Sequence, residues 1–256
     1  MSQLALITLY GPKDNILEST ISECQKIISA IPGIKYSPYD MRQIHATLVG
    51  LERLDSTEFN KYFSEYRNQK KTIDFNGLIK FLRESNEIKF QVQIGGFSQQ
   101  NYPFTSMGKK PYERSFQIIK DKVVLIGWPI SRKKKQNVAK EMDLDINVYP
   151  NTLDNIRHSL QNYNILHRYH ANPTDIDNDF YFRIGILDRN SITDKNLEKV
   201  EDNIRAFLSS IKPIILSVED IMIAQYKSEE LPLDSTQTWS LSDKKLTQNF
   251  LWSLYS

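Results

Sequence analysis

The sequence predicts an α+β fold, built as one domain of two pseudo-equivalent lobes. Short β-favouring runs and amphipathic helical segments interleave along the 256 residues, and no stretch has the composition of a linker between independent domains. With 40% hydrophobic and 25% charged residues, the composition is that of a globular protein of this length. The same interleaving also permits an α/β arrangement.

Charge and composition exclude several classes of protein. The 33 Lys and Arg residues against 31 Asp and Glu give a formal charge of +2, which excludes a histone-like polycation and leaves a locally basic surface open. The apolar runs are far shorter than the roughly 20 residues of a membrane span. The N-terminal segment has no basic leader, and a single cysteine cannot form an internal disulfide. We therefore expect a cytoplasmic protein without a membrane partner.

The first half of the chain alternates between the two kinds of element. Residues 4–10 are β-rich and end at a Gly-Pro turn signal, and the apolar spacing that follows predicts a helix opened by a capping box from Asn15 to Glu18. Cys24 lies on the apolar stripe of that helix, which indicates a core residue, with a reactive thiol as the alternative. The other patterns predict strands at 43–51, 88–94, 116–119 and 123–128, and helices at 56–69 and 73–84.

The second half begins with the densest basic run, residues 131–136. A solvated linker and a nucleic-acid contact both fit this run. The later patterns predict a helix opening near Asn151, a loop at 171–179, a strand at 180–187, a helix at 197–211, a strand at 214–226 and a last helix around 242–255.

His45 is the most informative of the four histidines. In a strand, Gln43, His45, Thr47 and Val49 share one face while Ile44, Ala46 and Leu48 form an apolar face. An imidazole and a hydroxyl then lie about 6–7 Å apart on one rigid strand. This pattern suits phosphate chemistry, because histidine moves protons near neutral pH and a threonine hydroxyl can bond a phosphate oxygen. A structural histidine is the alternative.

The order of elements around Ile-His-Ala-Thr-Leu-Val-Gly resembles the 2H phosphoesterase superfamily of RNA 2′,3′-cyclic phosphodiesterases, also called 2′-5′ RNA ligase-like proteins. The resemblance implies a two-lobed pseudo-symmetric fold, with antiparallel sheets lining a central cleft and helices outside. It also implies two His-x-Thr/Ser motifs that face each other, with one histidine as general base and the other as general acid. His45 and Thr47 match the first motif. Residues 55–120 form an enlarged insert by this comparison, and the helix around 242–255 is an extra one.

The resemblance places the second motif in the strand at 180–187, where Arg183 takes the histidine position and Gly185 the hydroxyl position. A guanidinium stays protonated at pH 7, so it binds phosphate rather than shuttling a proton. Alternation puts Tyr181 and Gly185 on the face of Arg183. Arg183 pairing with an acid such as Asp188 is the alternative, as is a β-bulge at Gly185.

Histidines upstream of this strand offer a replacement for the missing proton carrier. His170, or His167, would fold into the cleft for this role, and a surface-loop position is the alternative. His158 is given no chemical role. We expect no metal site and no cofactor, because His and Asp do not occur at ligand spacing on a common face. The acids at 143–145 and 175–179 are expected in solvated loops, since the glycine and glutamate of a calcium loop are missing.

Three functions follow. The first is a phosphodiesterase-like protein that binds and cleaves a cyclic phosphate or phosphodiester, with catalytic His45 and Thr47 and with Arg183, Tyr181, Gly185, Gln43 and His170 contacting the ligand. The second is an inactive nucleotide-binding module that uses the same cleft. The third is an interaction protein that uses the aromatic insert or the C-terminal helix. The expected partners are a nucleotide, a cyclic nucleotide or an RNA terminus, not duplex DNA, and the sequence leaves the oligomeric state open.

Overall fold

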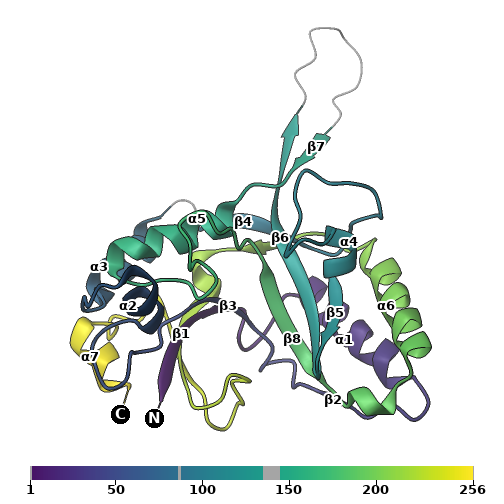
Figure 1. The fold of residues 1–256 in the computed structure, drawn as a ribbon, viewed down its shortest axis with the longest axis horizontal. Helices are drawn as coiled ribbons and strands as arrows, with labels where there is room; N and C mark the ends of the chain where they lie inside the picture. The colour runs from purple at the N-terminus through teal and green to yellow at the C-terminus, as the bar shows by residue number, and fades with distance from the viewer. Residues whose placement is uncertain (1, 86–87, 135–144, 256) are drawn as a thin grey trace, which may run out of the picture.

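The computed structural model describes residues 2–85, 88–134 and 145–255, which form a mixed structure of helices around an antiparallel sheet (Figure 1). The strands are β1 (Gln3–Thr8), β2 (Tyr36–Pro38), β3 (Ala46–Gly50), β4 (Phe90–Ile94), β5 (Phe116–Ile119), β6 (Lys122–Lys134), β7 (Asp145–Val148), β8 (Phe180–Leu187), β9 (Ile214–Leu216), β10 (Ile221–Tyr226) and β11 (Gln237–Ser240). The helices are α1 (Asn15–Ser29), α2 (Lys61–Arg67), α3 (Phe75–Glu84), α4 (Pro111–Arg114), α5 (Thr152–Ser159), α6 (Asp194–Leu208) and α7 (Gln248–Ser253).

The strands join in the order β11-β10-β1-β3-β8-β6-β4-β9, with β2 added to β8 and with β5 and β7 added to β6. The strands of this order pair antiparallel, which agrees with the α+β prediction. β3 and β8 lie in the middle of this order. They join the part of the sheet around β1 to the part around β6.

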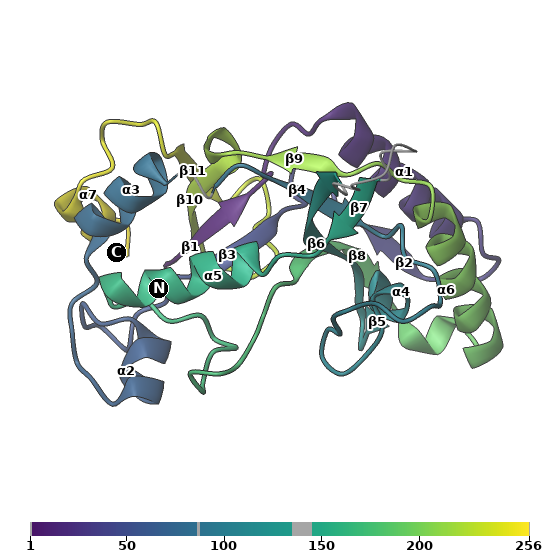
Figure 2. The ribbon, with the colours of Figure 1, turned by 90° about the horizontal axis from the view of Figure 1, so that it is seen from above.

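The helices gather at two ends of the sheet. Helices α1 and α6 pack side by side at one end, and α2, α3 and α7 lie at the other, with α5 passing along β3 (Figure 2). This distribution follows from burial, because each helix turns one apolar stripe toward the sheet. In α1 that stripe is Leu17, Ile21, Cys24 and Ile28, all buried.

Cys24 is a core residue. Its side chain is fully buried, and burial raises the pKa of the thiol, which therefore stays protonated and unreactive at neutral pH. The start of α1 differs by one residue from the prediction. Asp14, not Asn15, is the N-cap, and its side chain accepts a hydrogen bond of 2.8 Å from the backbone N of Leu17.

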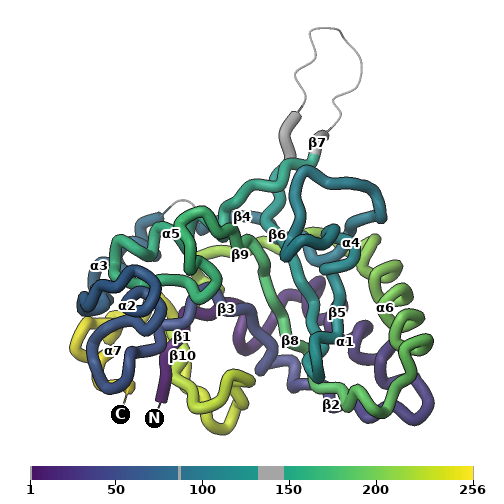
Figure 3. The backbone as a smooth tube through the Cα atoms, viewed as in Figure 1, coloured from purple at the N-terminus to yellow at the C-terminus, as the bar shows by residue number. Residues whose placement is uncertain are grey.

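Three predicted elements were wrong in extent. The run at 214–226 is two strands, because Ser217 donates to Asp220 Oδ2 and closes a short turn; β9 then joins β4 while β10 joins β1 (Figure 3). The last helix is only α7, which starts where the hydroxyl of Thr247 caps the backbone N of Phe250. Residues 131–134 of the basic run form the end of β6 and pair with β7, so they are not a linker. Residues 135 and 136 of this run lie outside the described residues.

The two faces of the sheet differ in what they bury. The main core takes one face, including Leu4 and Leu6 of β1 and Phe180 and Phe182 of β8. The other face carries two smaller apolar clusters. The first cluster lies on β1 and β10 (Ala5, Ile7, Tyr10, Ala224, Tyr226, Leu231), and the second, which we call the aromatic cluster, surrounds β6 (Phe97, Val124, Ile126, Trp128). Since β3 and β8 lie between β1 and β6, the middle of this second face belongs to them.

Candidate functional site

The site is built on the backbone pairing of Ala46 in β3 with Phe182 in β8. His45 precedes Ala46 and Arg183 follows Phe182, so the antiparallel register sets His45 and Arg183 opposite each other. Ala46 and Phe182 point into the main core. By alternation, His45 and Arg183 therefore lie on the second face, between its two apolar clusters.

A β-bulge follows the His-x-Thr motif in β3. Thr47 pairs with Ile7 and Val49 pairs with Leu6, so Leu48 is the extra residue. Alternation breaks here, and Val49 turns into the main core beside Leu48. The prediction that Val49 shares a face with His45 and Thr47 was therefore wrong. Thr47 itself is exposed.

A matching bulge occurs in β8. Arg183 pairs with Val124 and Gly185 pairs with Val123, so Ile184 is the extra residue. The bulge anticipated at Gly185 thus lies one residue earlier. Beyond it, Leu187 is buried in the main core and not on the face of Arg183.

The two bulges define a local twofold relationship between the strands. A rotation that exchanges the two members of the central pair places His45 on Tyr181, Thr47 on Arg183, and each bulge on the other. Arg183 is therefore the counterpart of Thr47. The position equivalent to His45 in this rotation is Tyr181, whereas the resemblance places Arg183 and Gly185 at the histidine and hydroxyl positions.

Gly185 does not leave room for a ligand. A Cβ built on it would lie 2.5 Å from Tyr36 Cε2 and 2.7 Å from the backbone O of Ser37. Tyr36 packs against the main core, and its hydroxyl donates to the backbone O of Ile184 at 2.9 Å. The glycine is thus needed for the close approach of β2, and its assignment as a ligand contact was wrong.

His45 is held as a neutral imidazole with a defined tautomer. Its Nδ1 lies 2.8 Å from the backbone O of Gln43. A carbonyl only accepts, so Nδ1 carries the proton and Nε2 keeps its lone pair. Burial lowers the pKa of His45 to about 4; the bond to Gln43 opposes this effect, and the charges of Lys13 and Arg183 add to it. At neutral pH the ring is therefore a proton acceptor.

Lys13 is a site residue that the sequence analysis missed. Its ammonium donates to the backbone O of Leu9 at 2.9 Å and of Gly11 at 3.0 Å, which holds it at the end of β1 near His45. Burial lowers the pKa of Lys13 to about 8, although Asp40 and Glu18 oppose the shift. The signal was a lysine two residues after the turn glycine that ends β1.

Arg183 is ion-paired, but not with the acid expected. Its Nη1 donates to Glu230 Oε1 at 2.8 Å, and Nη2 lies 3.7 Å from Glu229 Oε2. Asp188 instead lies 3.9 Å from Lys35. Gln43 reaches the same segment, since its Nε2 donates to the backbone O of Glu230 at 2.8 Å.

Tyr181 borders the aromatic cluster and is half-buried. Burial raises the pKa of its phenol, and the charge of Arg183 opposes that shift. The hydroxyl therefore remains protonated at neutral pH and can donate. His45, Thr47, Tyr181 and Arg183 thus gather on one face of the sheet, with Gln43 at its edge. We call this group of residues the His45 face.

His170 and His167 are not part of this group. Both are buried, so neither the surface-loop position nor the ligand contact fits them. His167 Nε2 lies 2.7 Å from Asp177 Oδ2, and His170 Nε2 lies 3.0 Å from Asp154 Oδ1. A side chain with no exposed surface, such as that of His170, is not available to a nucleotide in this conformation.

Two acids of the loop at 171–179 are buried rather than solvated. Asp179 accepts from Arg114 at 2.8 Å and from Trp128 Nε1 at 2.7 Å. Asp177 pairs with Arg157 at 3.2 Å, and Arg157, His167 and Asp179 together lower the pKa of Asp177 against the effect of burial. The prediction failed because buried cations from distant segments satisfy these carboxylates.

Arg157 connects the buried Asp177 to strand β3, which carries Thr47 of the His-x-Thr motif. Its guanidinium donates to the backbone O of Leu48 at 2.8 Å and of Thr47 at 3.2 Å. It also donates to the backbone O of Asp177 at 2.8 Å. The bulge after Thr47 exposes these strand carbonyls, and Arg157 on α5 satisfies them.

Two hollows occur in the described part of the structure. One of about 620 Å³ has Phe81 and Tyr163 in its lining, and one of about 430 Å³ lies beside Trp128 and Asp179. Neither is lined by His45 or Arg183. The central cleft between two lobes stays a prediction.

Comparison with known proteins adds no assignment. No protein-family model matches the chain, and no curated protein matches its sequence. Among the described residues, no helix is long and apolar enough to cross a membrane.

Proposed function

We propose that the protein binds a phosphate monoester or cyclic phosphodiester of a nucleotide or RNA end on the His45 face, and hydrolyses it slowly. The observation that carries the proposal is the gathering of His45, Lys13 and Arg183 with the exposed hydroxyl of Thr47. Burial, together with the charges of Lys13 and Arg183, lowers the pKa of His45, and two cations beside a neutral imidazole favour an anionic ligand.

The half-buried ring of Tyr181 supports a ligand with an aromatic part. Tyr181 packs against the aromatic cluster, whose four members are themselves buried. Aromatic side chains provide stacking surfaces for nucleobases, worth about 1–3 kcal/mol per base. A nucleotide would then place its phosphate between Arg183 and Thr47 and its base toward β6.

The chemistry follows from the protonation states of His45 and Tyr181 at neutral pH. Neutral His45 accepts a proton at Nε2 from the attacking water, and the P–O bond to the leaving oxygen breaks as the new P–O bond forms. Protonated Tyr181 donates to the leaving oxygen, and Arg183 stabilises the charge on the phosphoryl oxygens. The twofold relationship of His45 to Tyr181 supports this division of roles.

A binding module without turnover is the second candidate. It is favoured by the low pKa of His45, about 4, which makes a weak base, and by the ion pair that already engages Arg183. In this case the same residues hold the phosphate and the P–O bond stays intact.

One experiment separates the candidates. The protein is incubated with 2′,3′-cyclic nucleotides, cyclic-ended RNA and cyclic oligonucleotides, and ligand and product are separated by chromatography. His45→Ala and Arg183→Ala are compared with Lys35→Ala, which removes an exposed cation from the same half of the sheet. Hydrolysis that is lost only in the first two variants supports the enzyme. Retention without product supports the module, and neither turnover nor retention in the unmodified protein refutes both.

A further inference from the structure

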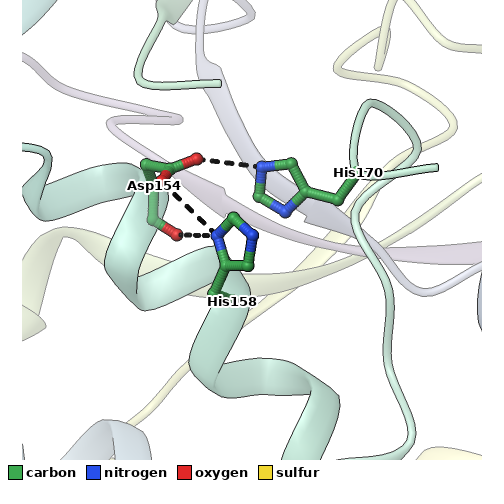
Figure 4. Close-up of side chains that lie close together, drawn as sticks. All are labelled: Asp154, His158 and His170. Atoms are coloured by element: carbon green, nitrogen blue, oxygen red, sulfur yellow. Dashed lines mark hydrogen bonds and ion pairs between the residues drawn. The ribbon is translucent and has the colours of Figure 1, made fainter. Parts of the chain in front are cut away.

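Asp154, His158 and His170 form a compact cluster at helix α5, which contacts β3. Asp154 and His158 are one turn apart on α5, and His170 reaches them from the following loop (Figure 4). One ligand atom from each residue lies within 4.8 Å of the other two. The i, i+4 spacing was visible in the sequence, so the expectation that His and Asp share no face at ligand spacing was wrong.

The distances match a tetrahedral metal ion. Bonds of about 2.0–2.1 Å in a tetrahedral zinc site place neighbouring donor atoms about 3.3 Å apart. His170 Nε2 lies 3.0 Å from Asp154 Oδ1. His158 Nδ1 lies 3.4 Å from Asp154 Oδ2 and also 3.0 Å from the backbone O of Asp154, so it must give up its proton and that hydrogen bond when it binds the ion. The two imidazole rings stack with their centres 4.0 Å apart.

The nitrogens of His170 lack the partners that burial demands. The residue has no exposed surface, and neither ring nitrogen makes a hydrogen bond to any residue within 2–85, 88–134 and 145–255. The 3.0 Å contact with Asp154 does not have hydrogen-bond geometry. A buried polar group without a hydrogen bond is unfavourable, and an ion between Nε2 and the carboxylate would give this nitrogen a partner.

The charges of the surrounding network point the same way. Asp154 and Asp177 are two buried carboxylates, and Arg157 is the one guanidinium within this buried group. Arg157 lies 3.2 Å from Asp177 Oδ1, and His167 Nε2 lies 2.7 Å from Asp177 Oδ2, so both groups are engaged by Asp177. A metal ion would place positive charge beside the other buried carboxylate, that of Asp154.

We propose that Asp154, His158 and His170 bind one divalent transition-metal ion, with zinc as the ion that fits two imidazoles and a carboxylate. Three protein ligands leave one tetrahedral position for water or an exogenous anion. His158 is the exposed edge of the site, with 29% of its side chain accessible, and provides the entry path. The carboxylate is oriented from behind, since the backbone N of Asp177 donates to Asp154 Oδ1 at 2.8 Å.

The ion fastens α5 to the loop at 164–179. Asn178 already links the two, because its Oδ1 accepts from the backbone N of Leu153 at 3.1 Å. Arg157 on the same helix holds the carbonyls of β3. Metal binding therefore stabilises the position of α5, whose Arg157 holds the backbone of β3. The ion does not contact the His45 face.

The test uses the full-length protein, stripped with a chelator and titrated with Zn²⁺ and then with Co²⁺. We expect one equivalent per chain, a rise in the thermal midpoint, and visible d–d absorption of a low-symmetry Co²⁺ site. His170→Ala and His158→Ala should each weaken Zn²⁺ binding by at least about 100-fold, since loss of even an outer-shell partner costs 10–100-fold. His45→Ala is the matched control, because it also removes one imidazole, and the groups that act on His45 are not those that act on His170.

His158→Ala keeps the test decisive if the buried variant fails to fold, because His158 is the most exposed ligand. No stoichiometric binding by the folded, stripped protein would overturn the proposal, and the cluster would then hold a proton in place of a metal. Equal binding by His158→Ala and the unmodified protein, or equal losses in His158→Ala and His45→Ala, would also overturn it.

Discussion

Ala46 of β3 and Phe182 of β8 pair across the middle of the sheet, and the local twofold axis through this pair relates His45 to Tyr181 and Thr47 to Arg183. The bulges that follow Thr47 and Arg183 obey the same relationship. The strands therefore present one proton acceptor and one proton donor diagonally across their junction, with a hydroxyl and a guanidinium at the other two corners.

Tyr181→Phe tests the role of the phenol as proton donor. Removing only the hydroxyl keeps the packing of the ring against the aromatic cluster. We expect turnover of a 2′,3′-cyclic nucleotide to fall by about 10²–10⁴-fold, as for other general acids, while KM changes little. Steady-state kinetics measure both. Unchanged turnover would remove Tyr181 from the mechanism.

The pH dependence of kcat/KM tests the role of His45. Because its pKa is lowered to about 4, the ring stays neutral and competent as a base well below the usual histidine value of 6.5. Activity should therefore hold as the pH falls through 6.5 and decline only near the lowered pKa. An acid limb near 6.5 in the kcat/KM profile would contradict this environment for the free protein.

Arg183→Ala should weaken binding of a cyclic nucleotide by about 10- to 100-fold, the range of a charge-assisted hydrogen bond. Isothermal titration calorimetry provides the measurement. Arg183→Lys keeps the charge without the paired donors, so its affinity should lie between those of Arg183→Ala and the unmodified protein. Lys35→Ala serves as the control for loss of one surface cation. Equal affinity of all three variants would place the phosphate elsewhere.

Arg157→Ala should destabilise the fold by about 3–5 kcal/mol, because it leaves Asp177 buried without its cation and the β3 carbonyls without a donor. Arg189→Ala is the comparison, since its pair with Asp194 is exposed and should contribute less than about 1 kcal/mol. Urea unfolding gives both free energies. A loss for Arg157→Ala as small as for Arg189→Ala would show that the network is not a support.

Gly185→Ala tests whether the space above β8 is filled. The new methyl group would meet Tyr36 and the backbone of Ser37, so we expect a loss of about 1–3 kcal/mol. Gly50→Ala is the comparison in β3, where the nearest atoms to a Cβ are those of the Glu52 carboxylate, a side-chain end that accepts from the Tyr226 hydroxyl and not a neighbouring strand. Thermal unfolding of both variants decides, and a tolerated Gly185→Ala would restore the open position expected from the sequence.

The sequence was most informative where one face of an element decides its place. The alternation in the strand at 180–187 and the apolar stripe through Cys24 identified β8 and α1 because burial acts through local periodicity. His45 and Thr47 were found in the same way, and the structure brings them to Arg183. The bulges at Leu48 and Ile184 were not predictable, because they depend on the register of neighbouring strands.

Long-range pairing explains the other errors. Asp177 and Asp179 belong to an acidic, turn-rich segment, and only the distant Arg157, Arg114 and Trp128 make their burial possible. Lys13 was overlooked for a related reason, since nothing local links it to His45. The spacing of Asp154 and His158 on one helix face was local, however, and was available to inspection.

The position of β1 between β3 and β10 has a consequence for synthesis on the ribosome. β1 gains β3 after Gly50 has been made, but β10 is complete only at Tyr226. At about 5–20 residues per second, roughly 9–35 s of translation separate the two pairings. Throughout that interval one hydrogen-bonding edge of β1 lacks the partner that it has in the folded protein, so this apolar strand is open to pairing with another chain.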